Sequence, residues 1–90
     1  MRAVHVVVSG RVQGVGFRAF VLRRAAEHRL AGWVRNRPDG DVECEAHGLP
    51  GELERFVEAL RAGPGSARVE HVAVEWFDAT EAPEGFRVTG

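Results

Sequence analysis

A glycine-rich segment between a predicted strand and a predicted helix constrains this chain more than any other feature. Residues 9–18 read SGRVQGVGFR, after an apolar run at positions 3–8 and before an amphipathic segment at positions 17–29. Glycines permit tight turns that bring backbone N–H groups together, and a helix N-terminus adds unpaired donors and a positive dipole end. Arg18 places a planar guanidinium beside these donors. The segment therefore predicts a site for a phosphate-sized anion that needs no metal ligand.

Two alternating patterns indicate where the strands lie in a sheet. Valine occupies both faces of the run that begins at Val4, which suits an interior strand. Acidic residues alternate along the later segment from Asp39 to Glu45, a pattern typical of a solvated edge strand. Cys44 lies on the apolar side of that segment, which predicts a buried thiol.

The order of the remaining elements predicts the fold class. A turn signal at Arg37-Pro38-Asp39-Gly40 makes its two flanking strands an antiparallel hairpin. The predicted strands are 3–8, 30–35, 41–47 and 69–77 with a short fifth at 85–89, and the predicted helices are 17–29 and 53–62. This β-α-β-β-α-β order indicates a single α+β domain over residues 1–90, with a ferredoxin-like antiparallel sheet and both helices on one face.

Positive charge is concentrated in the first part of the chain. Residues 1–37 contain eight arginines against one acid, a net charge of +7, whereas residues 38–90 contain four arginines against twelve acids, a net charge of −8. The overall charge of −1 argues against bulk affinity for nucleic acid or a membrane surface. Either the polarity favours a small anion at the glycine-rich segment, or the acids only solvate the later elements. The single cysteine excludes an internal disulfide.

Two common phosphate-binding motifs are disfavoured. A P-loop needs a lysine after its last glycine, and this chain contains none. The segment from Gly14 to Ala19 does match the G-x-G-x-x-A fingerprint of dinucleotide-binding folds. Such folds continue with a parallel strand and further β-α units, however, whereas a hairpin is predicted here.

The sequence resembles the acylphosphatase family through two motifs. The first is Gly10-x-Val12-Gln13-Gly14-Val15-x-Phe17-Arg18, and the second is Gly32-Trp33-Val34-Arg35-Asn36, which continues through Gly40-x-Val42 to Gly48. Both motifs occur in the family's order and spacing, and the resemblance covers essentially the whole chain. After Phe86, the C-terminal residues 87–90 lack the aromatic residue that is common near the family's C-terminus, which leaves the local packing there open.

The resemblance implies hydrolysis of acyl phosphates to a carboxylate and inorganic phosphate. It assigns phosphate binding to Arg18 and orientation of the attacking water to Asn36. The backbone N–H groups of Gln13, Gly14, Val15, Gly16, Phe17 and Arg18 are expected to surround the phosphoryl oxygens, with the side chain of Gln13 only bracing the loop. No cofactor, metal, nucleic acid or membrane partner is expected, and a cytoplasmic monomer is predicted.

Two alternatives from other functional classes remain open. Related domains lie within carbamoyl-transfer maturation proteins, which implies an accessory domain that handles carbamoyl phosphate. Ferredoxin-like domains also include RNA-binding modules that stack bases on aromatic residues of the central strands. Those predicted strands carry no row of aromatic side chains here.

Overall fold

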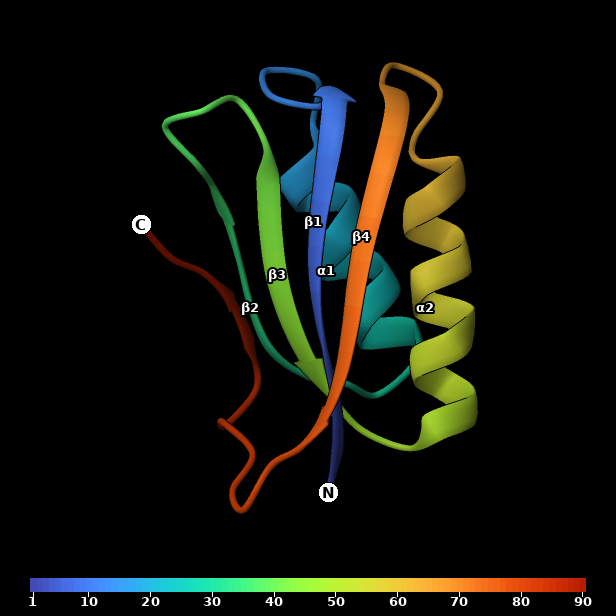
Figure 1. Ribbon diagram of the computed structural model, residues 1–90, viewed down its shortest axis with the longest axis vertical. Helices are drawn as coiled ribbons and strands as arrows, with labels where there is room; N and C mark the ends of the chain where they lie inside the picture. Colours follow the sequence, from blue (N-terminus) through green and yellow to red (C-terminus); the bar gives the residue numbers. More distant parts are fainter.

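The computed structural model describes residues 1–90 and contains five strands and two helices. The elements are β1 (Arg2–Arg11), α1 (Phe17–Glu27), β2 (Ala31–Asn36), β3 (Val42–His47), α2 (Pro50–Ala62), β4 (Arg68–Asp78) and β5 (Phe86–Val88). The strands form one sheet in the order β4-β1-β3-β2-β5, and both helices pack on the same face of it (Figure 1). The predicted ferredoxin-like arrangement is confirmed. Neither helix is long and apolar enough to cross a membrane.

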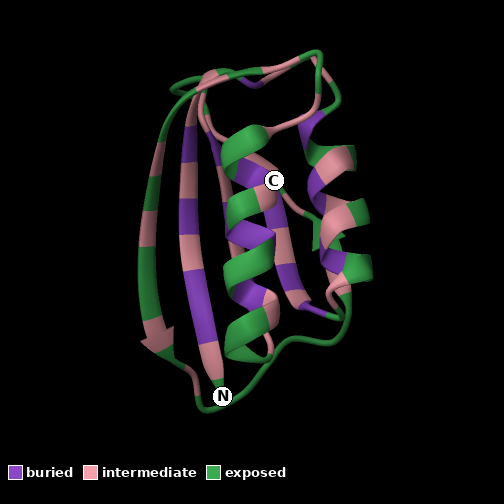
Figure 2. Cartoon of the chain, turned by 90° about the vertical axis from the view of Figure 1, so that its right-hand side faces the viewer, coloured by how far each residue is buried: buried purple, intermediate pink, exposed green.

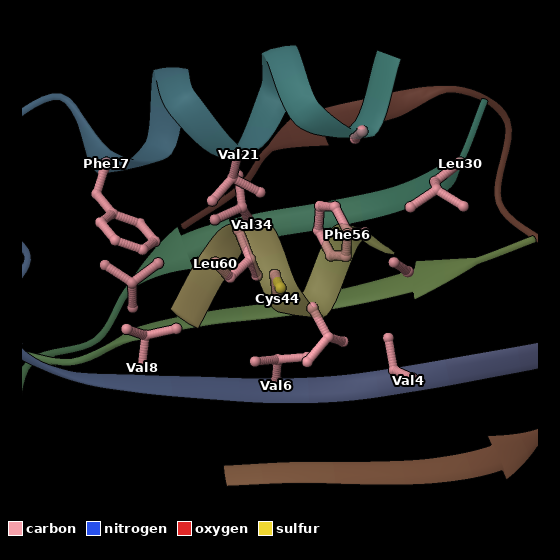
Figure 3. Packing of buried hydrophobic residues seen from close by; sticks show 14 of the residues in the cluster. Val4, Val6, Val8, Phe17, Val21, Leu30, Val34, Cys44, Phe56 and Leu60 are labelled. Atoms are coloured by element: carbon pink, nitrogen blue, oxygen red, sulfur yellow. The ribbon is translucent and has the colours of Figure 1, made fainter. Parts of the chain in front are cut away.

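The core lies between the helices and the interior strands. β1 pairs antiparallel with β3 on one side and β4 on the other, so its predicted interior position is confirmed. Val4, Val6 and Val8 are buried towards the helices, where Phe17 of α1 and Phe56 of α2 pack over them (Figure 3). Edge strand β4, in contrast, contains no fully buried residue (Figure 2).

The prediction that the acidic strand lies at an edge is wrong. β3 lies between β1 and β2, and its acidic side chains project from the face of the sheet that no helix covers. Glu43 accepts hydrogen bonds there from His5 Nε2 at 2.6 Å and from Arg35 Nε at 2.7 Å. Burial alone would raise the pKa of Glu43, but these hydrogen bonds and charges together lower it. The alternation of acids therefore reflects an open sheet face with paired charges.

The fifth strand forms as predicted but makes the sheet mixed. β5 pairs with β2 in parallel, with Val88 opposite Val34, while all other pairings are antiparallel. The Gly32 N–H donates to the Gly85 carbonyl at 2.8 Å, and the Thr89 N–H donates to the Val34 carbonyl at 2.9 Å. The chain after β4 crosses one end of the sheet before it adds β5, which gives β5 the direction of β2 (Figure 1).

Helix α1 ends two residues before the predicted boundary. Arg29 adopts a left-handed conformation with φ 55°, the only non-glycine residue with positive φ. The Leu30 N–H donates to the Ala25 carbonyl and the Arg29 N–H to the Ala26 carbonyl, which together form a Schellman motif. Glycine usually occupies this position, so the sequence contains no ordinary signal for this helix end.

Candidate functional site

Three connections meet at one end of the sheet. The β1–α1 loop, the β2–β3 turn and the α2–β4 loop all lie at the end where β1 and β2 terminate (Figure 1). Gly14 and Gly16 in the first of these have φ values of 73° and 78°, a region that L side chains rarely adopt. These two glycines let the chain reverse direction and enter α1 with its N-terminus directed towards the same end.

The N-terminus of α1 carries positive charge without a compensating acid. Gly16 is the N-cap residue, no side chain accepts a hydrogen bond from the first turn, and that turn contains no acidic residue. The backbone N–H groups of the first turn therefore lack the usual acceptor. Arg18 adds a full positive charge where the helix dipole is already positive. Its side chain is exposed and takes part in no ion pair. Such an arrangement favours a bound anion.

Two side chains hold the loop in place. Gln13 Nε2 donates to the Arg37 carbonyl at 2.7 Å and to the Asp41 carbonyl at 3.0 Å, which ties the loop to the β2–β3 turn. Ser66 Oγ, in the α2–β4 loop, donates to the Val15 carbonyl at 2.7 Å. Each bond joins residues distant in sequence, so the loop geometry depends on the folded sheet and both neighbouring connections.

A cavity of about 320 Å³ opens beside this loop. Its lining residues are Val12, Gly14, Gly16, Phe17, Arg18, Ala19, Leu22, Asn36 and Val88. Asn36, the last residue of β2, has a buried side-chain oxygen with no hydrogen-bond partner. A buried acceptor without a partner costs free energy unless a water or ligand donates to it. The cavity thus combines a cation, free backbone donors and an unsatisfied amide acceptor.

Arg18 is the only ionisable side chain that lines the cavity. His28 lies at the other end of α1, where its Nδ1 is 2.9 Å from Glu52 Oε1, and this hydrogen bond lowers the pKa of Glu52. Cys44 is fully buried in the core, and burial raises the pKa of its thiol. No group of three or more histidine, cysteine, aspartate or glutamate side chains could hold a metal ion. The cavity therefore offers positioning and electrostatic stabilisation rather than a general base or a nucleophile.

Comparison with known proteins identifies the family. A family model for acylphosphatases matches residues 4–88. The acylphosphatase of Salinibacter ruber is 53% identical over 87 residues, which covers 97% of this chain and 92% of the relative. The chain belongs to the acylphosphatase family. The predicted resemblance is thus confirmed.

Solved structures agree with this membership. The crystal structure of acylphosphatase from Bacillus subtilis superposes with a TM-score of 0.96 at 41% identity, with full coverage of both chains. The crystal structure of HypF from T. kodakarensis has a TM-score of 0.86 at 36% identity, but the match covers 99% of this chain and only 12% of HypF. An acylphosphatase-like fold therefore occurs both as a short chain and as a small part of a larger one.

Most of the site residues predicted from the two motifs lie around the cavity. Gly14, Gly16, Phe17, Arg18 and Asn36 line it, whereas Gln13 and Val15 lie in the loop but are not lining residues. The side chain of Gln13 braces the loop, as the sequence predicts. The roles of these residues in phosphate binding and water orientation stay predictions.

Sequence reasoning missed two contributions to the site. Ser66 contacts the loop across 51 positions of sequence, and no local pattern around it indicates that contact. Leu22 and Val88 line the cavity from α1 and β5. The helical spacing of Leu22 from Arg18 could have placed both on one face, but nothing in the sequence indicates that β5 joins β2.

Proposed function

We propose that this chain hydrolyses acyl phosphates to a carboxylate and inorganic phosphate at the cavity beside the β1–α1 loop. Membership of the acylphosphatase family supports the reaction. The observation that carries the site assignment is the N-terminus of α1, which has an unpaired Arg18, no capping side chain and no acid in its first turn. A phosphoryl group is the ligand whose charge and geometry match these donors.

The phosphoryl group binds at the polar end of the cavity. Backbone N–H groups between Gln13 and Arg18 surround its oxygens, and the guanidinium of Arg18 donates two parallel hydrogen bonds. These groups stabilise the negative charge that spreads over the phosphoryl oxygens in the transition state. Removal of one such donor typically lowers kcat by about 10²–10³-fold.

Asn36 orients the attacking water. Its buried oxygen lacks a partner, which leaves one acceptor for a water proton while the amide N–H₂ group can donate to phosphate. The water oxygen bonds to phosphorus, the bond from phosphorus to the acyl oxygen breaks, and the carboxylate leaves with the electron pair. The water proton passes to a phosphate oxygen or to solvent, because an amide is not a useful base near neutral pH. The step needs no covalent intermediate and no metal.

Release of inorganic phosphate from benzoyl phosphate tests this proposal directly. Arg18→Lys keeps the charge but removes the planar fork, and is expected to lower kcat/KM by at least about tenfold. Arg23→Lys is the matched control, because Arg23 is exposed on the same helix and does not line the cavity. Equal activity of both variants would refute the role of Arg18.

Asn36→Ala distinguishes orientation of the attacking water from anchoring of the phosphate. The expected result is a large loss of kcat with a much smaller change in competitive inhibition by inorganic phosphate. Equal losses in both quantities would reassign Asn36 to phosphate anchoring. Activity should also survive excess chelator, and its loss would contradict the metal-independent step.

Carbamoyl phosphate handling, which the family resemblance also implies, is the second candidate. The identity is 53% to the acylphosphatase of Salinibacter ruber and 36% to HypF, which favours hydrolysis of acyl phosphates in general. Comparison of kcat/KM for carbamoyl phosphate and benzoyl phosphate distinguishes the two.

A further inference from the structure

We propose that the end of the cavity formed by Ala19, Leu22 and Val88 binds the acyl group and selects substrates with a bulky apolar acyl chain. The inference rests on the proposed function, since it concerns the part of the substrate that the phosphate-binding motif does not contact. It names a substrate class: acyl phosphates with an aromatic or branched aliphatic acyl group.

The cavity has two chemically distinct ends. Arg18 and Asn36 provide its polar side chains, with backbone donors of the glycine-rich loop beside them. Leu22 lies on α1 four residues after Arg18 and three after Ala19, spacings that place it beside each of them on the helix surface. A ligand anchored at Arg18 can therefore extend along α1 by one helical turn and reach Leu22.

Strand β5 supplies the opposite wall. Val88 pairs with Val34 of β2, two residues before Asn36 along the same strand. The parallel addition of β5 thus brings a C-terminal apolar side chain next to the residue proposed to orient water. This wall exists only because β5 joins the sheet beside β2.

The apolar end is incompletely covered by the rest of the chain. Val88 is one of the few large hydrophobic residues that are exposed, with 43% of its surface accessible, and Leu22 is only partly buried. An apolar acyl group would remove water from both side chains, which is favourable. A carbamoyl group would place its polar N–H₂ against side chains that offer no hydrogen bond, which is unfavourable.

The size of the cavity is compatible with such a substrate. At about 320 Å³ it lies near the lower end of the range for small-molecule sites. This volume can hold a phosphoryl group with one ring or a short branched chain.

The ratio of kcat/KM for benzoyl phosphate to that for acetyl phosphate tests the inference. Leu22→Ala is expected to lower the ratio about tenfold, because a few methylene groups in an apolar pocket discriminate by that order. Val88→Thr preserves the shape of an exposed side chain and replaces a methyl by a hydroxyl, so the protein still folds, and a decrease of about threefold is expected. Inorganic phosphate occupies only the polar end, so its inhibition constant as a competitive inhibitor should change by less than about twofold. Leu49→Ala is the control, because Leu49 is 73% exposed and does not line the cavity.

The outcomes separate this inference from the proposed function. If the unsubstituted chain hydrolyses both substrates and neither Leu22→Ala nor Val88→Thr changes the ratio relative to Leu49→Ala, the acyl-binding role is wrong and the proposed function stands. If the unsubstituted chain hydrolyses neither substrate, the proposed function fails and the inference with it. A higher ratio in either variant also overturns the acyl-binding role.

Discussion

The side-chain amide of Gln13 is expected to stabilise both the fold and the anion-binding loop. Its Nε2 donates to the carbonyls of Arg37 and Asp41, at 2.7 and 3.0 Å, on opposite sides of the β2–β3 turn. The Arg37 N–H donates to the same Asp41 carbonyl at 2.8 Å, so the amide completes a closed set of bonds across the turn. Gln13→Ala removes both donations and leaves the turn held by its own backbone alone.

The expected loss of stability follows from the number of hydrogen bonds removed and from where they lie. A typical internal hydrogen bond contributes about 1 kcal/mol net, so Gln13→Ala is expected to lower the unfolding free energy by about 2 kcal/mol. For a domain of this size, each kcal/mol lowers Tm by about 4–8 °C. Ser66→Ala, which removes a single exposed hydrogen bond to the Val15 carbonyl, is expected to cost about 1 kcal/mol or less.

Urea unfolding monitored by far-ultraviolet circular dichroism measures both variants. The slope of the unfolding free energy against urea concentration should stay the same, since neither substitution changes the surface exposed on unfolding. A loss below about 0.5 kcal/mol for Gln13→Ala, or a loss no larger than that of Ser66→Ala, would refute the energetic argument. Inhibition by inorganic phosphate should weaken in both variants, because both loosen the loop. If phosphate inhibition is unchanged while stability falls, Gln13 supports the turn but does not position the site.

Three further outcomes concern the core and the open sheet face. The pKa of Glu43 is lowered in the folded chain, so its stabilising contribution is present above the unfolded pKa and is lost as the pH falls through the folded pKa. The loss of unfolding free energy caused by Glu43→Gln should therefore be largest near neutral pH and shrink as the pH falls below the ordinary pKa of 4.5. A methyl group at Gly32 would overlap the Glu45 carbonyl, so Gly32→Ala should lower the unfolding free energy by about 3 kcal/mol or more. Gly14→Ala should lower it by only about 1 kcal/mol, because the space around Gly14 is open. Cys44 should react with an aromatic disulfide reagent only after unfolding, since it is fully buried with a raised pKa, and rapid modification of the folded chain would contradict its core position.

Local sequence patterns were sufficient to predict the elements and the loop, because these depend on short-range chemistry. The valine alternation predicted an interior strand, and the turn at Arg37 to Gly40 predicted the hairpin. The edge assignment of the acidic strand failed for a physical reason. A solvated edge and an uncovered sheet face produce the same alternation of acids, and only long-range pairing distinguishes them. The pairing of Glu43 with His5, on a strand 38 positions away, belongs to that long-range information.

The same limit applies to the site. Arg18 could be proposed from the glycine-rich segment beside it, and Asn36 from its place in the second motif of the resemblance. Ser66 and Val88 could not be proposed in this way. Ser66 contacts the β1–α1 loop, and Val88 lines the cavity, only because the α2–β4 loop and β5 fold back beside residues far earlier in the sequence. The polar half of the cavity was thus accessible from the sequence, whereas its apolar wall required the tertiary structure.

The two helices show why α1 stands out as functional. Neither helix has a capping side chain, but helix α2 has proline at its start, Glu52 in its first turn and Arg61 in its last, as the helix dipole favours. Helix α1 differs at its N-terminus, where it has no acid and carries Arg18 at the positive end of the dipole. Both differences cost stability unless negative charge is present there. Local rules are most often broken where function requires it, and a bound anion would remove both penalties of α1 together. The contrast within one chain therefore supports the proposed anion site at the start of α1 on energetic grounds that do not depend on the family resemblance.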